Sequence, residues 1–238
     1  MKQLISHIHP DNTSERFRHE LKYLCSEGEL QQIHARIQGL CSPDPHVGAD
    51  GIYHIRSVYF DDYRNRCFFE NENGNDPREK YRIRIYNASD RQITLECKKK
   101  ERTMTHKDSC PLTVAQYHAI MENRLTEADI HHDLLRKFYA LQQEGLHPKV
   151  IVAYDRMPFV YDFGNVRITF DRNIGSSTDL SGFFQPHLPL RPILPTGKHV
   201  LEVKYDELLP DFLYNAMNLG SLRQTNFSKY YLCRKYSF

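Results

Sequence analysis

The feature that most constrains this chain is an alternation of ionic and apolar residues that recurs in separate stretches of the sequence. Residues 80–85 read Lys-Tyr-Arg-Ile-Arg-Ile, which places three cations on one face of an extended strand. The same period of two occurs in residues 17–23, 166–171 and 201–205, and in 95–100 with Lys99 as an exception. A period of two is typical of a β-strand whose two faces meet different surroundings. The chain is therefore predicted to build a sheet with one ionic and one apolar face.

An ionic face of this kind either coats the outside of a sandwich or lines the inside of a barrel. Two patterns favour the barrel. Glu-x-Lys occurs in three strands, and Arg82 and Arg84 lie on one face, about 7 Å apart at the backbone. Neighbouring guanidinium forks suit bidentate recognition of phosphate. We expect an α+β protein with an antiparallel eight-stranded β-barrel, an ionic lumen, and helices packed outside.

The order of elements follows from turn residues and caps. Strands are predicted at 16–24, 52–60, 66–72, 80–87, 92–100, 149–157, 165–172 and 198–206. Helices are predicted from Ser26 to about Leu40, after Pro111, from Thr126 to about Gln143, from Pro210 and from Asn226. Residues 1–14 are expected to form a flexible leader, and residues 15–238 a single domain.

Composition excludes several classes of function. A net charge of only +2 provides no overall field that would attract nucleic acid. The six cysteines contain no C-x-x-C pair, which indicates reduced thiols rather than a metal knuckle or a disulfide framework. No stretch approaches the roughly 18 apolar residues that cross a bilayer. We expect a cytoplasmic location without direct insertion into a membrane.

The carboxylates of the ionic face have two possible roles. Many like charges in one lumen are costly unless a polyanion and a metal compensate them. Glu202 or Glu20 is then expected to hold Mg²⁺ or Mn²⁺ through oxygen. Alternatively, Glu20 and Glu96 act as counter-ions that hold the lysines in place. The run Lys98 to Lys100 also leaves open whether Lys100 faces the lumen or solvent.

Several short motifs occur in a characteristic order along the chain. They are Arg18-His19-Glu20-Leu21-Lys22-Tyr23, Val58-Tyr59-Phe60-Asp61, Arg82-Ile83-Arg84, Glu96-Cys97-Lys98, Tyr154-Asp155-Arg156, Arg167-Ile168-Thr169-Phe170-Asp171, Leu201-Glu202-Val203-Lys204-Tyr205 and Ser228-Lys229-Tyr230. Together they resemble the catalytic domain of the vacuolar transporter chaperone (VTC) family, a polyphosphate polymerase of the CYTH-like triphosphate tunnel metalloenzyme superfamily. The resemblance extends from about Arg16 to Tyr236.

The resemblance implies a role for individual residues. By the matching motifs, phosphate is bound by Lys22, Arg82, Arg84, Lys98, Arg156, Arg167, Lys204 and Lys229. Glu202 is implied as the metal ligand, and the strand pattern adds Glu20 as a second candidate. The catalytic set would be Arg82, Arg84, Lys98 and Glu202. Arg156 rests on the resemblance rather than on the alternation, because it lies near the expected end of a strand.

The predicted activity is metal-dependent transfer of the γ-phosphate of ATP to a growing polyphosphate chain. Its partners would be ATP and polyphosphate or tripolyphosphate, and a membrane-protein partner stays open. Hydrolytic relatives carry Glu-x-Glu-x-Lys on the first strand, whereas this chain has Arg18-x-Glu20-x-Lys22, which favours the polymerase. The alternatives are a hydrolase of the same fold acting on tripolyphosphate or a nucleoside triphosphate, and a non-catalytic module that binds polyphosphate.

Overall fold

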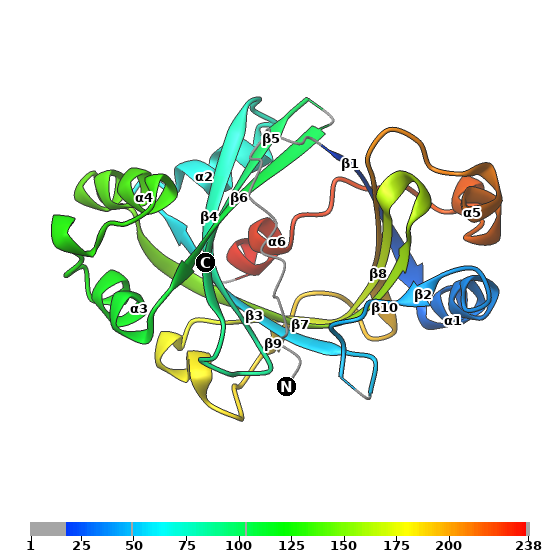
Figure 1. Ribbon diagram of the computed structural model, residues 1–238, viewed down its shortest axis with the longest axis horizontal. Helices are drawn as coiled ribbons and strands as arrows, with labels where there is room; N and C mark the ends of the chain where they lie inside the picture. The colour runs from blue at the N-terminus through cyan, green and yellow to red at the C-terminus, as the bar shows by residue number, and fades with distance from the viewer. Residues whose placement is uncertain (1–17, 49, 103, 237–238) are drawn as a thin grey trace, which may run out of the picture.

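A computed structural model describes residues 18–48, 50–102 and 104–236, and it shows a closed antiparallel β-barrel (Figure 1). Eight long strands follow one another around the ring in the order β7-β3-β4-β5-β6-β1-β10-β8, and pairing of β7 with β8 closes it. They are β1 (Arg18–Ser26), β3 (Tyr53–Asp61), β4 (Arg78–Tyr86), β5 (Ile93–Glu101), β6 (Met104–Leu112), β7 (His147–Tyr161), β8 (Val166–Ser177) and β10 (Lys198–Tyr205). Two short strands, β2 (Ser42–Pro43) and β9 (Arg191–Pro192), pair with β7 and β8. The predicted fold class is confirmed.

The strands are strongly staggered around the ring. β1 pairs with β10 over most of its length, from His19 to Ser26. Its pairing with β6, in contrast, involves only Arg18 and His19 among the residues that the structure describes. Such a stagger tilts the strands and widens a barrel of a given number of strands. This geometry leaves room for polar side chains and water inside.

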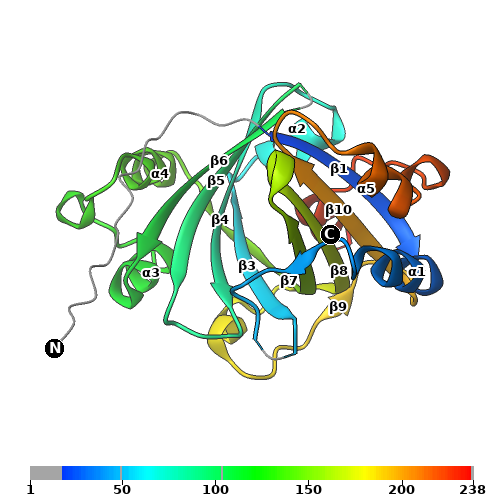
Figure 2. The ribbon, with the colours of Figure 1, turned by 45° about the vertical axis from the view of Figure 1, so that its right-hand side comes forward.

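The outer faces of the strands are apolar, and helices cover them (Figure 2). The helices are α1 (Glu27–Ile37), α2 (Arg66–Glu72), α3 (Val114–Met121), α4 (Asp133–Gln143), α5 (Asp211–Ala216) and α6 (Lys229–Lys235). Short 3₁₀ turns occupy Glu127–Asp129, Phe163–Asn165, Leu180–Phe184 and Leu219–Ser221. On one side, Phe138 of α4 packs with Ile83 and Leu95. On the opposite side, Ile33 of α1 packs with Val203.

A third core joins α2 and α6 to β3 and β7. Phe68 of α2 and Tyr230 and Cys233 of α6 are buried there with Val150 and Val152. This third core lies on the inner face of the barrel, because Val152 is opposite Ser57, whose Oγ accepts a hydrogen bond from Arg84, and Tyr230 lines the cavity. Apolar side chains and α6 therefore occupy part of the interior, and the ionic side chains line the rest.

One predicted strand is wrong. Residues 66–72 form α2 rather than a strand, although Cys67 and the two following phenylalanines resemble a short buried strand. The carboxylate of Asp61, at the end of β3, accepts hydrogen bonds from the backbone N–H groups of Cys67 and Phe68, at 2.9 and 3.1 Å. These bonds satisfy donors that a helix start leaves unpaired. The sequence pattern did not reveal this cap, which comes from the end of the preceding strand.

The eighth barrel strand is instead β6, which was not predicted. Its sequence, MTHKDSCPL, has few apolar residues. Its extended conformation is stabilised by pairing with β5 along nine residue pairs. The helix predicted from Thr126 is also shorter than expected. Thr126 caps only a 3₁₀ turn, Ile130 is extended, and α4 begins at Asp133. β7 runs to Tyr161, beyond the predicted end at 157.

Two further predictions concern the ends of the chain and membranes. The expected leader, residues 1–14, lies outside the described residues. Within residues 18–48, 50–102 and 104–236, no helix has the length and apolar character needed to cross a membrane.

Candidate active site: an ionic tunnel

The interior of the barrel holds a cavity of about 660 Å³. It is lined by all the residues that the sequence suggested for phosphate and metal, namely Lys22, Arg82, Arg84, Lys98, Arg156, Arg167, Lys204, Lys229, Glu20 and Glu202. They come from β1, β4, β5, β7, β8, β10 and α6, so they lie far apart in the sequence. The closed barrel is what brings them together. Their roles in binding and catalysis remain predictions.

The two arginines of β4 share one carboxylate. Arg82 contacts Glu96 through Nε and Nη2, at 2.7 and 2.6 Å, and Arg84 Nη1 lies 3.9 Å from the same oxygen. Tyr59 and Tyr154 accept further hydrogen bonds from Arg82 and Arg84, at 2.8 and 3.1 Å. Burial alone would raise the Glu96 pKa, but these cations hold that pKa well below its usual range. Glu96 is thus an ionised counter-ion that orients both guanidinium groups.

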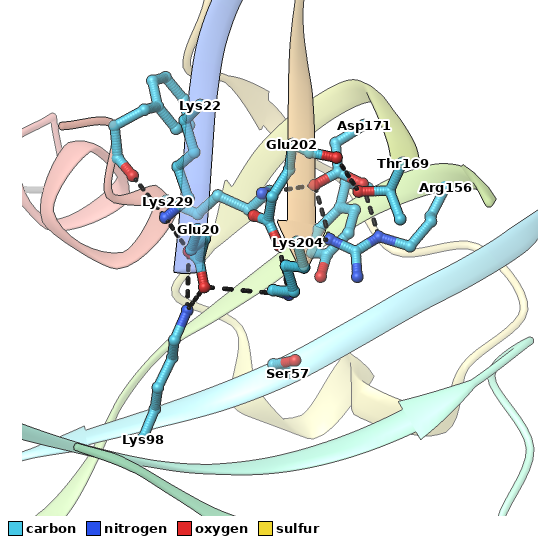
Figure 3. Close-up of polar contacts among 12 residues, drawn as sticks. Glu20, Lys22, Ser57, Lys98, Arg156, Thr169, Asp171, Glu202, Lys204 and Lys229 are labelled. Carbon is cyan, nitrogen blue, oxygen red and sulfur yellow. Dashed lines mark hydrogen bonds and ion pairs between the residues drawn. The ribbon is translucent and has the colours of Figure 1, made fainter. Parts of the chain in front are cut away.

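A second group, the buried ion cluster, consists of Arg156, Asp171 and Lys229 (Figure 3). Arg156 donates to both oxygens of Asp171, at 2.7 and 2.8 Å, and Lys229 Nζ lies 2.6 Å from Asp171 Oδ2. The Asp171 side chain is fully buried. Burial would raise its pKa, yet Arg156 and Lys229 keep the pKa below its usual value. Because Lys229 begins α6, this cluster also ties α6 to the barrel wall.

Arg156 lies inside a long strand rather than at a strand end, which corrects the sequence interpretation. It sits opposite Tyr53 on β3 and Asp171 on β8. The neighbouring ring of Tyr154 lies 5.3 Å from the Arg156 guanidinium carbon and 4.8 Å from Lys229 Nζ. The aromatic face supports both cations. The positions of these two groups are therefore fixed before any ligand arrives.

A third group, the lumen lysine cluster, consists of Glu20, Lys22, Lys98 and Lys204. Glu20 is 2.6 Å from Lys22 Nζ and 2.7 Å from Lys98 Nζ, and Lys204 Nζ lies 4.0 Å away. Figure 3 shows Lys98 reaching across the lumen to Glu20. Burial and Glu202 would raise the Glu20 pKa, but the three lysines outweigh them and lower it. Glu20 is accordingly ionised and shared.

The pKa of Lys98 is strongly perturbed. Burial lowers the pKa of Lys98 to about 7, since the attraction of Glu20 is opposed by Lys22 and Lys204. A side chain with such a pKa gains a proton readily when a polyanion enters. This behaviour suits a phosphate site whose charge adjusts to the ligand.

Glu202 lies between the buried ion cluster and the lumen lysine cluster. It is ion-paired with Lys204 and lies 4.0 Å from Arg156 Nη2. In the sheet, Glu202 is opposite Lys22, whereas Glu20 is opposite Lys204. The two carboxylates are therefore diagonal neighbours on the inner face.

This pair offers carboxylate oxygens of the kind that a hard divalent cation binds. Among the described residues, no three His, Cys, Asp or Glu side chains are grouped so that they could hold a metal alone. Mg²⁺ and Mn²⁺ commonly take one or two carboxylates and complete their shell with phosphate and water oxygens. Glu20 and Glu202, beside a lumen lined with cationic side chains, fit that kind of site.

Arg167 stands apart from the other predicted phosphate ligands. Its Nη2 lies 2.8 Å from Asp44 Oδ2, and Tyr53 donates to the other oxygen of Asp44 at 2.8 Å. The residues after α1 thus hold Arg167 at the edge of the cavity.

Five more cations among the described residues line the cavity and were not selected as phosphate ligands: Arg18, Arg78, Lys80, Lys100 and Lys107. Lys80 continues the alternation of β4, and Arg78 has the same parity, so the pattern itself contained the signal. Lys100 is two residues beyond Lys98 and faces the cavity, which settles the register that the sequence left open.

Comparison with known proteins agrees with this geometry. The VTC domain family model matches residues 17–238. No curated protein sequence matches the chain. A putative adenylate cyclase from Bacillus halodurans superposes with a TM-score of 0.54 at 12% identity, over 90% of this chain and 94% of that one.

A putative adenylyl cyclase from Hippeastrum, described as having a dominant triphosphatase activity, gives a TM-score of 0.55 at 12% identity. The match covers 92% of this chain and 95% of that one. At such identities the likeness concerns the fold alone. Together with the match of the family model over nearly the whole sequence, it shows that the chain belongs to the VTC domain family and has the triphosphate tunnel fold.

Proposed function

We propose that this protein is a polyphosphate polymerase that transfers the γ-phosphate of ATP to a polyphosphate chain inside the barrel. The observation that carries the proposal is the convergence of eight predicted phosphate ligands and two carboxylates on one cavity, in a member of the VTC family. Such a concentration of cations is costly without a polyanion. A nucleoside triphosphate and a polyphosphate both supply the missing charge.

The reaction is an in-line displacement at phosphorus. A terminal oxygen of the acceptor attacks the γ-phosphorus, the bond to the β–γ bridging oxygen breaks, and ADP leaves. Catalysis then consists of positioning and charge stabilisation. Arg82 and Arg84 would hold non-bridging oxygens through their forks, since Glu96 already fixes their orientation. Lys98 would neutralise charge on the transferring group.

Glu202 and Glu20 would hold the divalent cation beside the phosphates. When bound, Mg²⁺ or Mn²⁺ would neutralise phosphate charge and polarise the phosphoryl group. The flanking Lys22 and Lys204 would then be released from the carboxylates to contact phosphate oxygens. The exchange of partners keeps every charge in the lumen compensated.

Hydrolysis of tripolyphosphate or a nucleoside triphosphate is the second candidate, favoured by the triphosphatase activity described for the Hippeastrum protein. Hydrolysis benefits from a carboxylate that accepts a proton from water. Glu20 and Glu96 both have pKa values below their usual range because lysines and arginines surround them, so they are weak bases. A phosphate oxygen needs no such base as a nucleophile. This electrostatic setting favours transfer to phosphate over transfer to water.

One assay separates the candidates. The protein is incubated with ATP and Mn²⁺. Gel electrophoresis then separates the polyphosphate products by length, and a second measurement quantifies the free phosphate that is released. Long-chain polyphosphate together with ADP supports the polymerase, whereas free phosphate alone identifies a hydrolase. Unchanged ATP, with retained binding of polyphosphate, identifies a binding module. Removal of the metal with a chelator is the control for metal dependence.

A further inference from the structure

Outside the lumen, large apolar side chains are exposed in two neighbouring segments of the chain. Phe163, Leu208 and Phe212 are 69%, 59% and 45% exposed. Phe163 lies in the turn that joins β7 to β8, Leu208 follows β10, and Phe212 belongs to α5. A single exposed apolar side chain is ordinary on a protein surface, whereas several in one region mark a contact site. The packing of the two segments shows that these three residues share one region.

The turn between β7 and β8 is held against the segment that leads into α5. The backbone N–H of Asp206 donates to the carbonyl oxygen of Gly164 at 3.2 Å. Gly164 has a φ of +74°, and a Cβ at this position would lie 2.6 Å from the carbonyl oxygen of Leu208. The ring of Tyr161 packs edge-on against Phe212, with 5.5 Å between the ring centres. The two segments therefore lie side by side and form one preorganised surface (Figure 2).

The charge of this surface is opposite to that of the lumen cations. Residues 161–165 and 205–216 contain four acidic residues and no lysine or arginine. Asp206 pairs with Arg18 at 2.8 Å, but Asp162, Glu207 and Asp211 are exposed and pair with no cation of the described residues. We call this surface the acidic apolar patch, and it consists of Asp162, Phe163, Glu207, Leu208, Asp211 and Phe212.

The acidic apolar patch adjoins the cavity through Arg18. The guanidinium of Arg18 contacts Asp206 and the carbonyl oxygen of Asn165, and the same side chain lines the cavity. Exposed carboxylates repel polyphosphate, nucleic acid and anionic lipid headgroups, because all of these are negatively charged. The patch is therefore unsuited to the substrates of the lumen. A protein segment that combines apolar side chains with lysine or arginine is complementary to both parts of the patch.

We propose that the acidic apolar patch is a docking site for a partner protein, which contributes an amphipathic segment with apolar residues flanked by lysine or arginine. Phe163 and Phe212 act as anchors, because aromatic side chains held on a preorganised surface lose little conformational entropy on binding. The carboxylates attract the basic flanks and set the orientation of the segment. The inference goes beyond the proposed function, since it concerns a surface outside the lumen and does not depend on the reaction inside it.

The test selects ligands for the full chain from a phage-displayed library of random peptides that are long enough for several helical turns. The most enriched peptide is synthesised with a fluorescent label, and its binding is measured by anisotropy. The patch variant combines Phe163→Ser with Phe212→Ser. Its matched control combines Tyr63→Ser with Phe69→Ser, two aromatic side chains outside the patch that are 66% and 47% exposed. A separate charge variant combines Asp162→Asn, Glu207→Gln and Asp211→Asn.

The enriched peptide is expected to carry apolar residues flanked by lysine or arginine. The patch variant should bind it about a hundredfold more weakly, because truncation of one aromatic anchor commonly costs about tenfold or more in affinity. The charge variant should bind about tenfold more weakly, and its affinity should depend less on salt than that of the parent. The control should bind like the parent, and melting temperatures of the same samples verify that each variant is folded.

Several results would overturn the docking site. They are a selection that enriches no peptide, enriched peptides that lack basic residues, and equal binding by the parent and the patch variant. Self-association of the parent in analytical ultracentrifugation, lost in the patch variant, would identify a second copy of this chain as the occupant instead. Binding of the parent to vesicles of phosphatidylcholine and phosphatidylserine, lost in the patch variant, would identify a membrane surface.

Discussion

The buried ion cluster and the lumen lysine cluster use similar residues in different surroundings. In the buried ion cluster, Asp171 has no exposure to water, and its partners Arg156 and Lys229 are about 9% and 10% exposed. In the lumen lysine cluster, Lys98 and Lys204 are 28% and 26% exposed and share Glu20. The first arrangement resembles a structural brace, because Arg156 and Lys229 are almost fully buried and both contact Asp171 directly. The second has water as an alternative partner, which is what exchange with a ligand requires.

The largest expected effect is the loss of folding stability when the buried ion cluster is broken. Asp171→Asn leaves Arg156 and Lys229 buried without their carboxylate, and breaking such a group costs about 3–5 kcal/mol of folding free energy. Glu20→Gln should cost clearly less, because Lys22 and Lys98 can turn to water in the cavity. Chemical denaturation of both variants measures the difference. Equal losses of stability would show that the two clusters do not differ in kind.

The next effect concerns Glu202, which lies between the clusters. Glu202→Gln preserves shape and hydrogen bonding but removes a charged oxygen from the proposed metal site. Loss of metal assistance, several kcal/mol at the transition state, should reduce turnover of ATP by roughly a hundredfold or more. Circular dichroism and tripolyphosphate binding serve as controls for folding. Unchanged Mn²⁺-dependent turnover would exclude Glu202 as a ligand and direct attention to Glu20.

A smaller effect tests the arginines of β4. Arg82→Lys and Arg84→Lys keep the positive charge but lose the planar fork, so each should weaken tripolyphosphate binding by about tenfold. Neither should be replaced by alanine for this purpose, since Glu96 would then lose a partner in a buried position. Calorimetry, with thermal melts of the same samples, gives both affinity and folding. If both variants bind tripolyphosphate as tightly as the parent, these arginines have a structural role instead of a role in binding.

The smallest effect is a pH dependence with opposite signs for folding and binding. The pKa of Lys80 is about 7 in the folded protein against an ordinary 10.5, so the unfolded chain binds more protons between these values. The Lys80 contribution to stability without ligand should therefore rise with pH above 7. Polyphosphate prefers the charged lysine, so affinity should fall less than tenfold between pH 6.5 and 8.5.

The difference between the parent and Lys80→Gln isolates this residue from other titrating groups. The variant should lose the added pH dependence in both measurements. Melting temperatures and polyphosphate affinities, each followed across the same pH range, provide the comparison. If parent and variant share the same pH profile, the Lys80 ammonium is not perturbed by its neighbours.

The sequence by itself determined the barrel and the facing of its side chains. Alternation in residues 80–85 and 201–205 specifies an apolar outer face and an ionic inner face, because successive side chains of a strand point in opposite directions. The same rule identified Arg82, Arg84, Glu20 and Glu202 as inward residues without any knowledge of neighbours, whereas Arg156 came from the family resemblance. The rule failed for residues 66–72, which form a helix that Asp61 caps from outside the segment. It also failed for β6, whose extended conformation depends on pairing with β5.

Only the tertiary structure decided which charges compensate one another. Lys80 and Lys98 look alike in the sequence, but β1 brings Glu20 to Lys98, whereas Asn71 and Ser228 meet Lys80. Asp171 likewise acquires its importance from Lys229, far along the chain. Electrostatic interactions depend on distance and burial, and both are set by the closure of the barrel rather than by the order of residues. Local pattern therefore fixes which way a side chain faces, and the fold determines its partner.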